Sequence, residues 1–142
     1  MALTPLGAVS CGSDSPLSTL EAFPVEGQVL FHGQPAPLAR ITFHPVGGSP
    51  ELQKLRPAGE ADQQGRFRLT TVGIGSGAPE GTYRVTVIWR GPDPGTDLQT
   101  VNPNVLSYEP NRLNKKYAEP ATTTLAATIT SGANRLAPFT VD

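Results

Sequence analysis

Apolar and polar residues alternate along two neighbouring stretches of the chain, residues 66–71 and 81–89. In the second stretch every other residue is apolar, namely Tyr83, Val85, Val87 and Trp89. A period of two residues is that of a strand with one buried face. Each stretch follows a turn signal that contains glycine with aspartate or proline. The pattern therefore predicts antiparallel strands that bury one face, with residues 62–65 forming a hairpin turn between a short strand at 58–61 and the strand 66–71.

The same alternation predicts further short strands along the rest of the chain. They cover residues 23–31, 37–45 and 122–129, and a last strand lies within 134–141, where Pro138 indicates a bulge or an edge position. Turn signals recur roughly every 8 to 12 residues. Seven strands of this kind predict an all-β fold, a seven-stranded Greek-key β-sandwich with very little helix.

The longest stretch without a regular period runs from residue 91 to residue 114 and contains four prolines. Loops of this length in compact domains are often functional. Candidates for contact with a partner lie in it or directly after it: Tyr108, Arg112, Lys115, Lys116 and Tyr117. The alternative for Tyr117 is that its ring holds the loop against the sandwich. Trp89, just before the loop, points at the core by its parity with the apolar residues of the preceding strand.

Composition narrows the class of protein. The chain has 142 residues, enough for one domain with a single core, and Gly and Pro together make up about a fifth of it, as in folds with many turns. Its formal net charge is -1, and Lys and Arg are mostly scattered, so a nucleic-acid partner is not expected. No apolar run approaches the roughly 18 residues of a membrane-spanning helix.

The single cysteine, Cys11, excludes an internal disulfide framework. The surrounding residues, Ala8-Val9-Ser10-Cys11-Gly12, resemble a bacterial lipobox, in which the cysteine is lipidated and becomes the new N-terminus. Only ten residues precede it and none is basic, so an upstream start would be needed to complete a signal peptide. The alternative is a free thiol on a tail. We expect residues 1–21 to be a signal-peptide remnant and flexible tether, and residues 22–142 to be the folded domain.

Several segments resemble the carboxypeptidase-regulatory-like (transthyretin-like) domain, and in particular the small predicted lipoproteins of this type in planctomycete bacteria. The resemblance lies in residues 25–29, 33–35, 41–45, 62–71, 77–87, 116–121 and 131–134 and covers about 25–142. It implies a transthyretin-like (prealbumin-like) sandwich, a lipid anchor at Cys11 and an extracytoplasmic place on a bacterial envelope membrane. Because a tyrosine recurs in the family where this chain has Tyr117, the resemblance also favours the packing role of that ring. Thr123-Thr124 stands where the family usually has Ser-Gly.

Residues suited to catalysis or to metal binding are few. Transthyretin-like hydroxyisourate hydrolases use several histidines and a C-terminal Tyr-Arg-Gly-Ser, whereas this chain has only His32 and His44 and ends in a different tetrapeptide. An iron site like that of the intradiol dioxygenases would need both histidines to converge with Tyr108 and Tyr117. Because His32 lies in a turn and His44 at the far end of the next strand, we expect no catalytic residue, cofactor or metal site.

These observations favour a non-enzymatic domain that acts as an interaction or structural module of the cell envelope, with residues 91–117 as its contact surface for an unknown protein or carbohydrate. An alternative is a carbohydrate-binding (starch-binding-like) module in which Tyr108 and Trp89 stack on sugar rings. A further alternative is a metal-dependent enzyme. Two exposed aromatic rings roughly 5 to 10 Å apart would favour the sugar-binding alternative, and a buried Trp89 would favour the interaction module.

Overall fold

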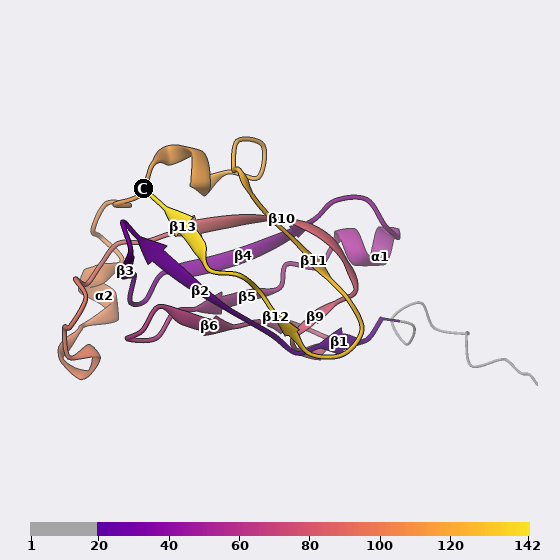
Figure 1. Ribbon diagram of the computed structural model, residues 1–142, viewed down its shortest axis with the longest axis horizontal. Helices are drawn as coiled ribbons and strands as arrows, with labels where there is room; N and C mark the ends of the chain where they lie inside the picture. Colours follow the sequence, from indigo (N-terminus) through magenta and orange to yellow (C-terminus); the bar gives the residue numbers. More distant parts are fainter. Residues whose placement is uncertain (1–19) are drawn as a thin grey trace, which may run out of the picture.

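Two β-sheets make up most of the molecule in the computed structural model, which describes residues 20–142 (Figure 1). The larger sheet has six strands, in the order β11 (Leu125–Ile129), β10 (Gly81–Ile88), β4 (Arg40–Pro45), β5 (Ala58–Glu60), β7 (Thr70–Thr71) and β8 (Gly75–Ser76). The smaller sheet is built around β2 (Val25–Phe31), which pairs with β3 (Gln34–Pro35), β6 (Arg66–Arg68), β12 (Asn134–Arg135) and β13 (Phe139–Val141). Strands β1 (Ala22–Phe23) and β9 (Ala78–Pro79) pair separately. The all-β prediction is confirmed, although the described chain has thirteen short strands where seven were expected.

The core lies between the two sheets. The ring of Phe139 on β13 is 6.4 Å from the ring of Phe43 on β4 and 6.1 Å from that of Phe67 on β6, so aromatic side chains join the sheets. The apolar face predicted for residues 81–89 is confirmed, because its four members are at most 1% exposed: Tyr83, Val85, Val87 and Trp89. Burial raises the pKa of Tyr83 to about 12, and its hydroxyl donates a hydrogen bond to the carbonyl of Pro79. The alternation in the sequence therefore located the buried face of the central strand.

The stretch 66–71 does not form the single strand of a hairpin with 58–61 that the sequence predicted. The turn itself forms, since Asp62 Oδ1 accepts hydrogen bonds from the backbone N–H groups of Gln64 and Arg66. However, β6 pairs with β2 in the smaller sheet, and only β7 pairs with β5 in the larger one. Leu69, between them, donates its N–H to Val25 and accepts at its carbonyl from Gly77. The chain thus crosses from one sheet to the other at this buried leucine.

The antiparallel pairing predicted from residues 66–71 and 81–89 does not extend to the end of the chain. Strands β12 and β13 both run parallel to β2, with Asn134 opposite Val25 and Phe139 opposite Val29. Pro138 lies in the break between the two short strands. Because a two-residue period is the same in parallel and antiparallel strands, the sequence pattern carried no information on their direction.

Helices are short, as expected. The segment 46–57 contains α1 (Pro50–Gln53), and the segment after β10 contains η3 (Leu98–Thr100), α2 (Pro103–Leu106) and η4 (Lys115–Ala118). Within the described residues, no helix is long and apolar enough to cross a membrane. Figure 1 places α2 at one end of the longest axis of the molecule and β1, next to the start of the described chain, at the other.

Candidate functional site

The long segment after β10 is fastened back onto the end of that strand. We divide it into a cover segment, residues 91–110, and an anchor segment, residues 111–118. The backbone N–H of Arg112 donates to the carbonyl of Trp89 at 2.6 Å, and Asn111 Oδ1 accepts from the N–H groups of Trp89 (3.0 Å) and Leu113 (3.2 Å). Leu113 is 5% exposed and joins the core. The anchor segment therefore closes the cover segment into a loop whose two ends meet at Trp89.

Arg112 is part of this closure. Its guanidinium carbon lies 4.3 Å from the centre of the Trp89 ring, and its Nη2 lies 2.7 Å from Asp93 Oδ1. The guanidinium thus covers the tryptophan and neutralises a carboxylate at the start of the cover segment. Although it was expected to face a partner, Arg112 makes its contacts within the molecule.

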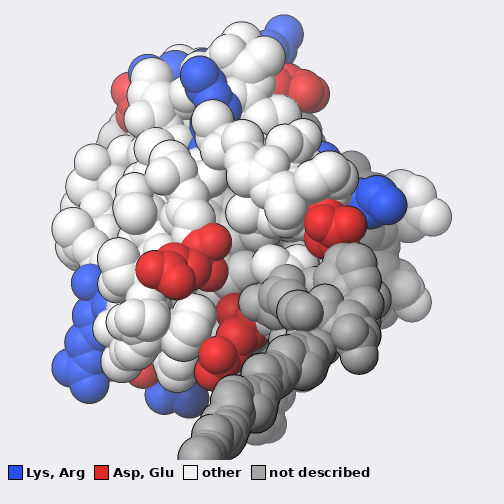
Figure 2. Space-filling view, turned by 90° about the vertical axis from the view of Figure 1, so that its right-hand side faces the viewer, with Lys and Arg blue, Asp and Glu red and all other residues white. Residues whose placement is uncertain are grey.

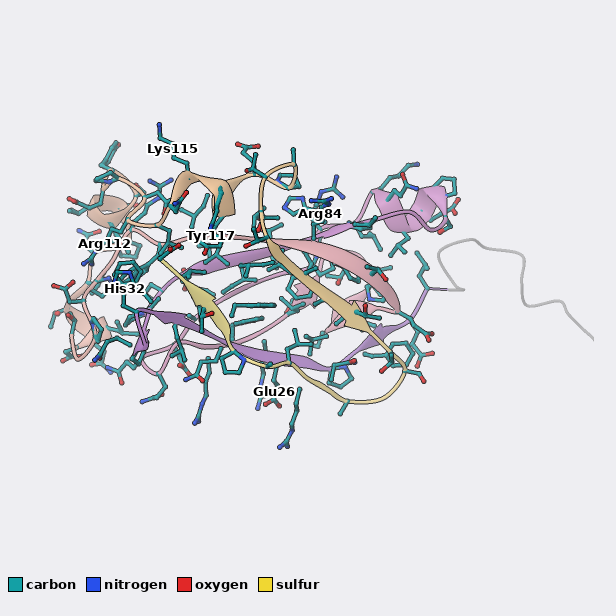
Figure 3. All side chains as sticks on the ribbon, turned by 45° about the horizontal axis from the view of Figure 1, so that its top comes forward. Glu26, His32, Arg84, Arg112, Lys115 and Tyr117 are labelled. Atoms are coloured by element: carbon teal, nitrogen blue, oxygen red, sulfur yellow. The ribbon has the colours of Figure 1, made fainter. Side chains whose placement is uncertain are left out.

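The anchor segment also buries Tyr117. The side chain is 5% exposed, and its hydroxyl donates a hydrogen bond to Asp142 Oδ1 at 2.9 Å. Burial raises the pKa of Tyr117, and the hydrogen bond to Asp142 raises it further. Lys116 Nζ lies 5.1 Å from the Tyr117 ring, whereas Lys115 is exposed and points away from the sheets (Figure 3). The ring of Tyr117 holds the segment against the sandwich, which was the alternative drawn from the sequence.

Tyr108, another residue of the predicted contact set, lies open to solvent. It is 88% exposed and stands two residues after the end of α2. Val105 within α2 is 59% exposed. The end of the molecule that carries α2 therefore presents an apolar and an aromatic side chain to solvent.

Beneath the cover segment lies a hollow of about 470 Å³. Its floor is the outer face of the larger sheet, where Glu60, Arg40 and Ile88 stand in one row across β5, β4 and β10. Two further residues extend this floor at its end, Leu38 and Arg90. The cover segment supplies the opposite wall with Leu98, Val101, Pro103, Leu106 and Ser107. Sequence reasoning missed this site, although the apolar residues at 98, 101 and 106 in a polar loop were a signal for it.

The hollow carries positive charge. Arg90 Nη1 donates to the backbone carbonyl of Glu109 at 2.7 Å. Because a carbonyl has no formal charge, this contact does not neutralise the guanidinium of Arg90. Arg40 stands directly opposite Glu60 in the strand register, yet within residues 20–142 neither arginine has a carboxylate oxygen within ion-pair distance. Two guanidinium groups and one carboxylate thus line a largely apolar space.

The residues of the alternative sites considered from the sequence have other contacts in the structure. Trp89 is 1% exposed and its Nε1 donates to the carbonyl of Pro37 at 2.8 Å, so it cannot stack on a sugar beside Tyr108. His32 stacks on Phe31, with ring centres 4.1 Å apart, and His44 Nε2 lies 2.9 Å from the hydroxyl of Thr86. In the part of the chain that the structure covers, no three His, Cys, Asp or Glu side chains gather as metal ligands would. Cys11 lies outside the described residues.

The end of the molecule opposite α2 has a different character. Figure 2 looks onto this end and shows acidic side chains beside the start of the described chain. The register of β1 with β9 places Ala22 opposite Pro79 and so brings Glu21 next to Glu80, both exposed. The apolar hollow and this acidic surface therefore lie at different ends of the sandwich.

Comparison of the chain with protein-family models, with curated proteins and with solved structures gives no match.

Proposed function

We propose that this chain is a non-enzymatic β-sandwich domain that binds a partner in the bacterial envelope through its cover segment, residues 91–110. The observation that carries the proposal is the closure of this segment. Its ends are held at Trp89 by backbone hydrogen bonds and by Arg112, while Val105 and Tyr108 face solvent. A loop that is ordered before binding loses less conformational entropy when a partner docks.

The location belongs to the same proposal. We place the domain on the extracytoplasmic side of a bacterial envelope, attached by a lipid at Cys11, with a transthyretin-like Greek-key topology. Support comes from the lipobox-like residues 8–12 and from the resemblance of residues 25–142 to carboxypeptidase-regulatory-like domains. The lipid anchor is tested by reading the coding frame upstream of Met1. Basic residues followed by an apolar run of roughly 7 to 15 residues are expected, and a stop codon without such a run refutes the anchor.

The binding role is tested with the full chain immobilised on a sensor and presented with purified glycans and envelope proteins. We expect at least one of them to bind saturably. Replacing the exposed side chains of the cover segment, in Val105→Ala and Tyr108→Ala, should weaken that binding by about tenfold, as for central interface residues. The matched control is Val72→Ala, because Val72 is 89% exposed on the turn between β7 and β8.

Two results would overturn the proposal. One is the absence of saturable binding to every member of the panel. The other is a partner whose affinity falls no more in the variants of the cover segment than in Val72→Ala, because that partner would use another surface.

A further inference from the structure

Building on the proposed binding role, we infer that the hollow beneath the cover segment is a site for a small amphiphilic carboxylate, a molecule with an apolar body and one negative charge. Its volume of about 470 Å³ falls within the range of roughly 300 to 1,000 Å³ typical of small-molecule sites. The choice of ligand follows from the shape, the polarity and the charge of its walls.

The walls favour an apolar body. A β-sheet face that lies open to water normally carries polar side chains, yet Ile88 stands on the outer face of β10 and lines the hollow. From the opposite side the cover segment contributes Leu98, Val101 and Leu106. All four of these side chains are partly exposed rather than buried in the sandwich core. An apolar ligand between them would remove surface from water on both sides.

Leu38 supports the same conclusion independently. Its φ is +63°, in the left-handed region that costs a residue with a branched side chain free energy and that glycine adopts freely. The backbone is held there by the N–H of Leu38, which donates to the carbonyl of Ala61 at 2.9 Å. The chain nonetheless has leucine at this position, and its side chain lines the hollow. Such strain concentrates at ligand sites, where a side chain is needed in one place.

The charges favour a carboxylate head group. Arg40 and Arg90 line the hollow without an ion-pair partner among residues 20–142, and guanidinium groups bind carboxylates through paired hydrogen bonds. Glu60, in the same row as Arg40, reduces the charge of the floor to about that of one cation. A ligand with one negative charge matches this balance, whereas a cation would meet two arginines and a dianion would be repelled by Glu60.

Isothermal titration of the full chain with decanoate tests the inference, with decanamide as a neutral ligand of the same length. We expect decanoate to bind with a stoichiometry of about one, and decanamide to bind at least about tenfold more weakly. Arg40→Met should lower the affinity for decanoate by about tenfold and leave that for decanamide unchanged. Leu106→Asp should weaken the binding of both ligands, because it places a carboxylate in the apolar wall.

Arg66→Met is the matched control, because Arg66 is an exposed arginine on a strand of the other sheet. It should bind decanoate as the wild type does, and circular dichroism should show that all three variants fold. The inference is overturned if decanoate does not bind saturably, if decanamide binds equally well, or if Arg40→Met and Arg66→Met behave alike.

The outcome is separable from that of the proposed function. Binding of decanoate without any partner in the envelope panel would refute the macromolecular role alone. If an envelope partner binds the wild type but not Tyr108→Ala, and decanoate does not bind, only the proposed ligand site is refuted.

Discussion

Replacing Arg112 by alanine should loosen the cover and anchor segments from the sandwich without disrupting the sheets. The guanidinium of this residue lies over the Trp89 ring at 4.3 Å and contacts Asp93 at 2.7 Å. The first contact joins the anchor segment to Trp89, directly after β10, and the second joins it to the start of the cover segment. Neither contact lies within a sheet. The substitution therefore removes interactions that only this attachment uses.

The expected cost follows from the exposure of the groups involved. The Asp93 side chain is 72% exposed and that of Arg112 is 38% exposed, so the ion pair is screened and contributes about 0.2 to 1 kcal/mol. A partly exposed cation over an indole ring adds about 0.5 to 1 kcal/mol. Together they stabilise the attachment by about 0.7 to 2 kcal/mol, which corresponds to a loss of roughly 2 to 8 °C in Tm for a domain of this size if the attachment unfolds with the rest of the domain.

The fluorescence of Trp89 reports on this attachment, because it is the only tryptophan in the chain and is 1% exposed. In Arg112→Ala we expect its emission to shift to longer wavelength and its quenching by acrylamide to increase. Arg135→Ala is the control, since Arg135 is exposed on β12 and makes no ion pair within the described chain.

Quenching in Arg112→Ala equal to that of the wild type, or no greater than in Arg135→Ala, would refute this reasoning. It would mean that the backbone hydrogen bonds at Trp89 hold the segment without help from the guanidinium.

Two further predictions concern stability. Gly77→Ala should cost more than about 3 kcal/mol in the free energy of unfolding, because φ is +100° and a Cβ would collide with the carbonyl of Phe23. Gly73→Ala, at φ +87° with nothing near its Cβ, should cost only about 1 to 2 kcal/mol, and equal costs in urea denaturation would contradict the steric argument. Burial, followed by the charge of Arg56, lowers the pKa of His44 below its ordinary value, so stability is highest above about pH 6.5 and declines as the pH falls below it. Urea denaturation at about pH 8 and about pH 5 should show a larger loss for the wild type than for His44→Gln, and equal losses would contradict the prediction.

The sequence predicted the strands with one buried face, because that prediction depends only on residues that are neighbours in the chain. In residues 82–87 each apolar side chain alternates with a polar one, and the register of a single strand decides which face is buried. The same local reasoning placed Trp89 in the core. The packing role of Tyr117 was favoured instead by the resemblance of residues 116–121 to carboxypeptidase-regulatory-like domains.

The pairing of strands could not be read in this way, because it depends on segments far apart in the chain. The alternation through residues 66–71 is unbroken, yet the strand leaves one sheet for the other at Leu69. Nothing in the period distinguishes a residue that pairs with β2 from one that pairs with β5. The parallel direction of β12 and β13 escaped prediction for the same reason.

The sequence did not predict the candidate site, because each of its residues, taken alone, has the pattern of an ordinary surface position. Arg40, Glu60 and Ile88 each read as the outward residue of a strand, and only the pairing of β4 with β5 and β10 places them in one row. The contacts of Arg112 within the molecule were not predicted, for a related reason. Its charge suggested a surface group, but its position over Trp89 depends on how the long segment folds back.

Figure 1 places α2, which lines the hollow, and β1 at opposite ends of the longest axis, and this bears on how a bound molecule would travel. A protein held to a membrane by its N-terminal side would turn the cover segment outward, towards whatever lies beyond the lipid surface. An amphiphile released from the hollow would then enter water rather than pass directly into the bilayer. In that arrangement the long axis of the sandwich would act as a spacer, and capture would take place away from the membrane.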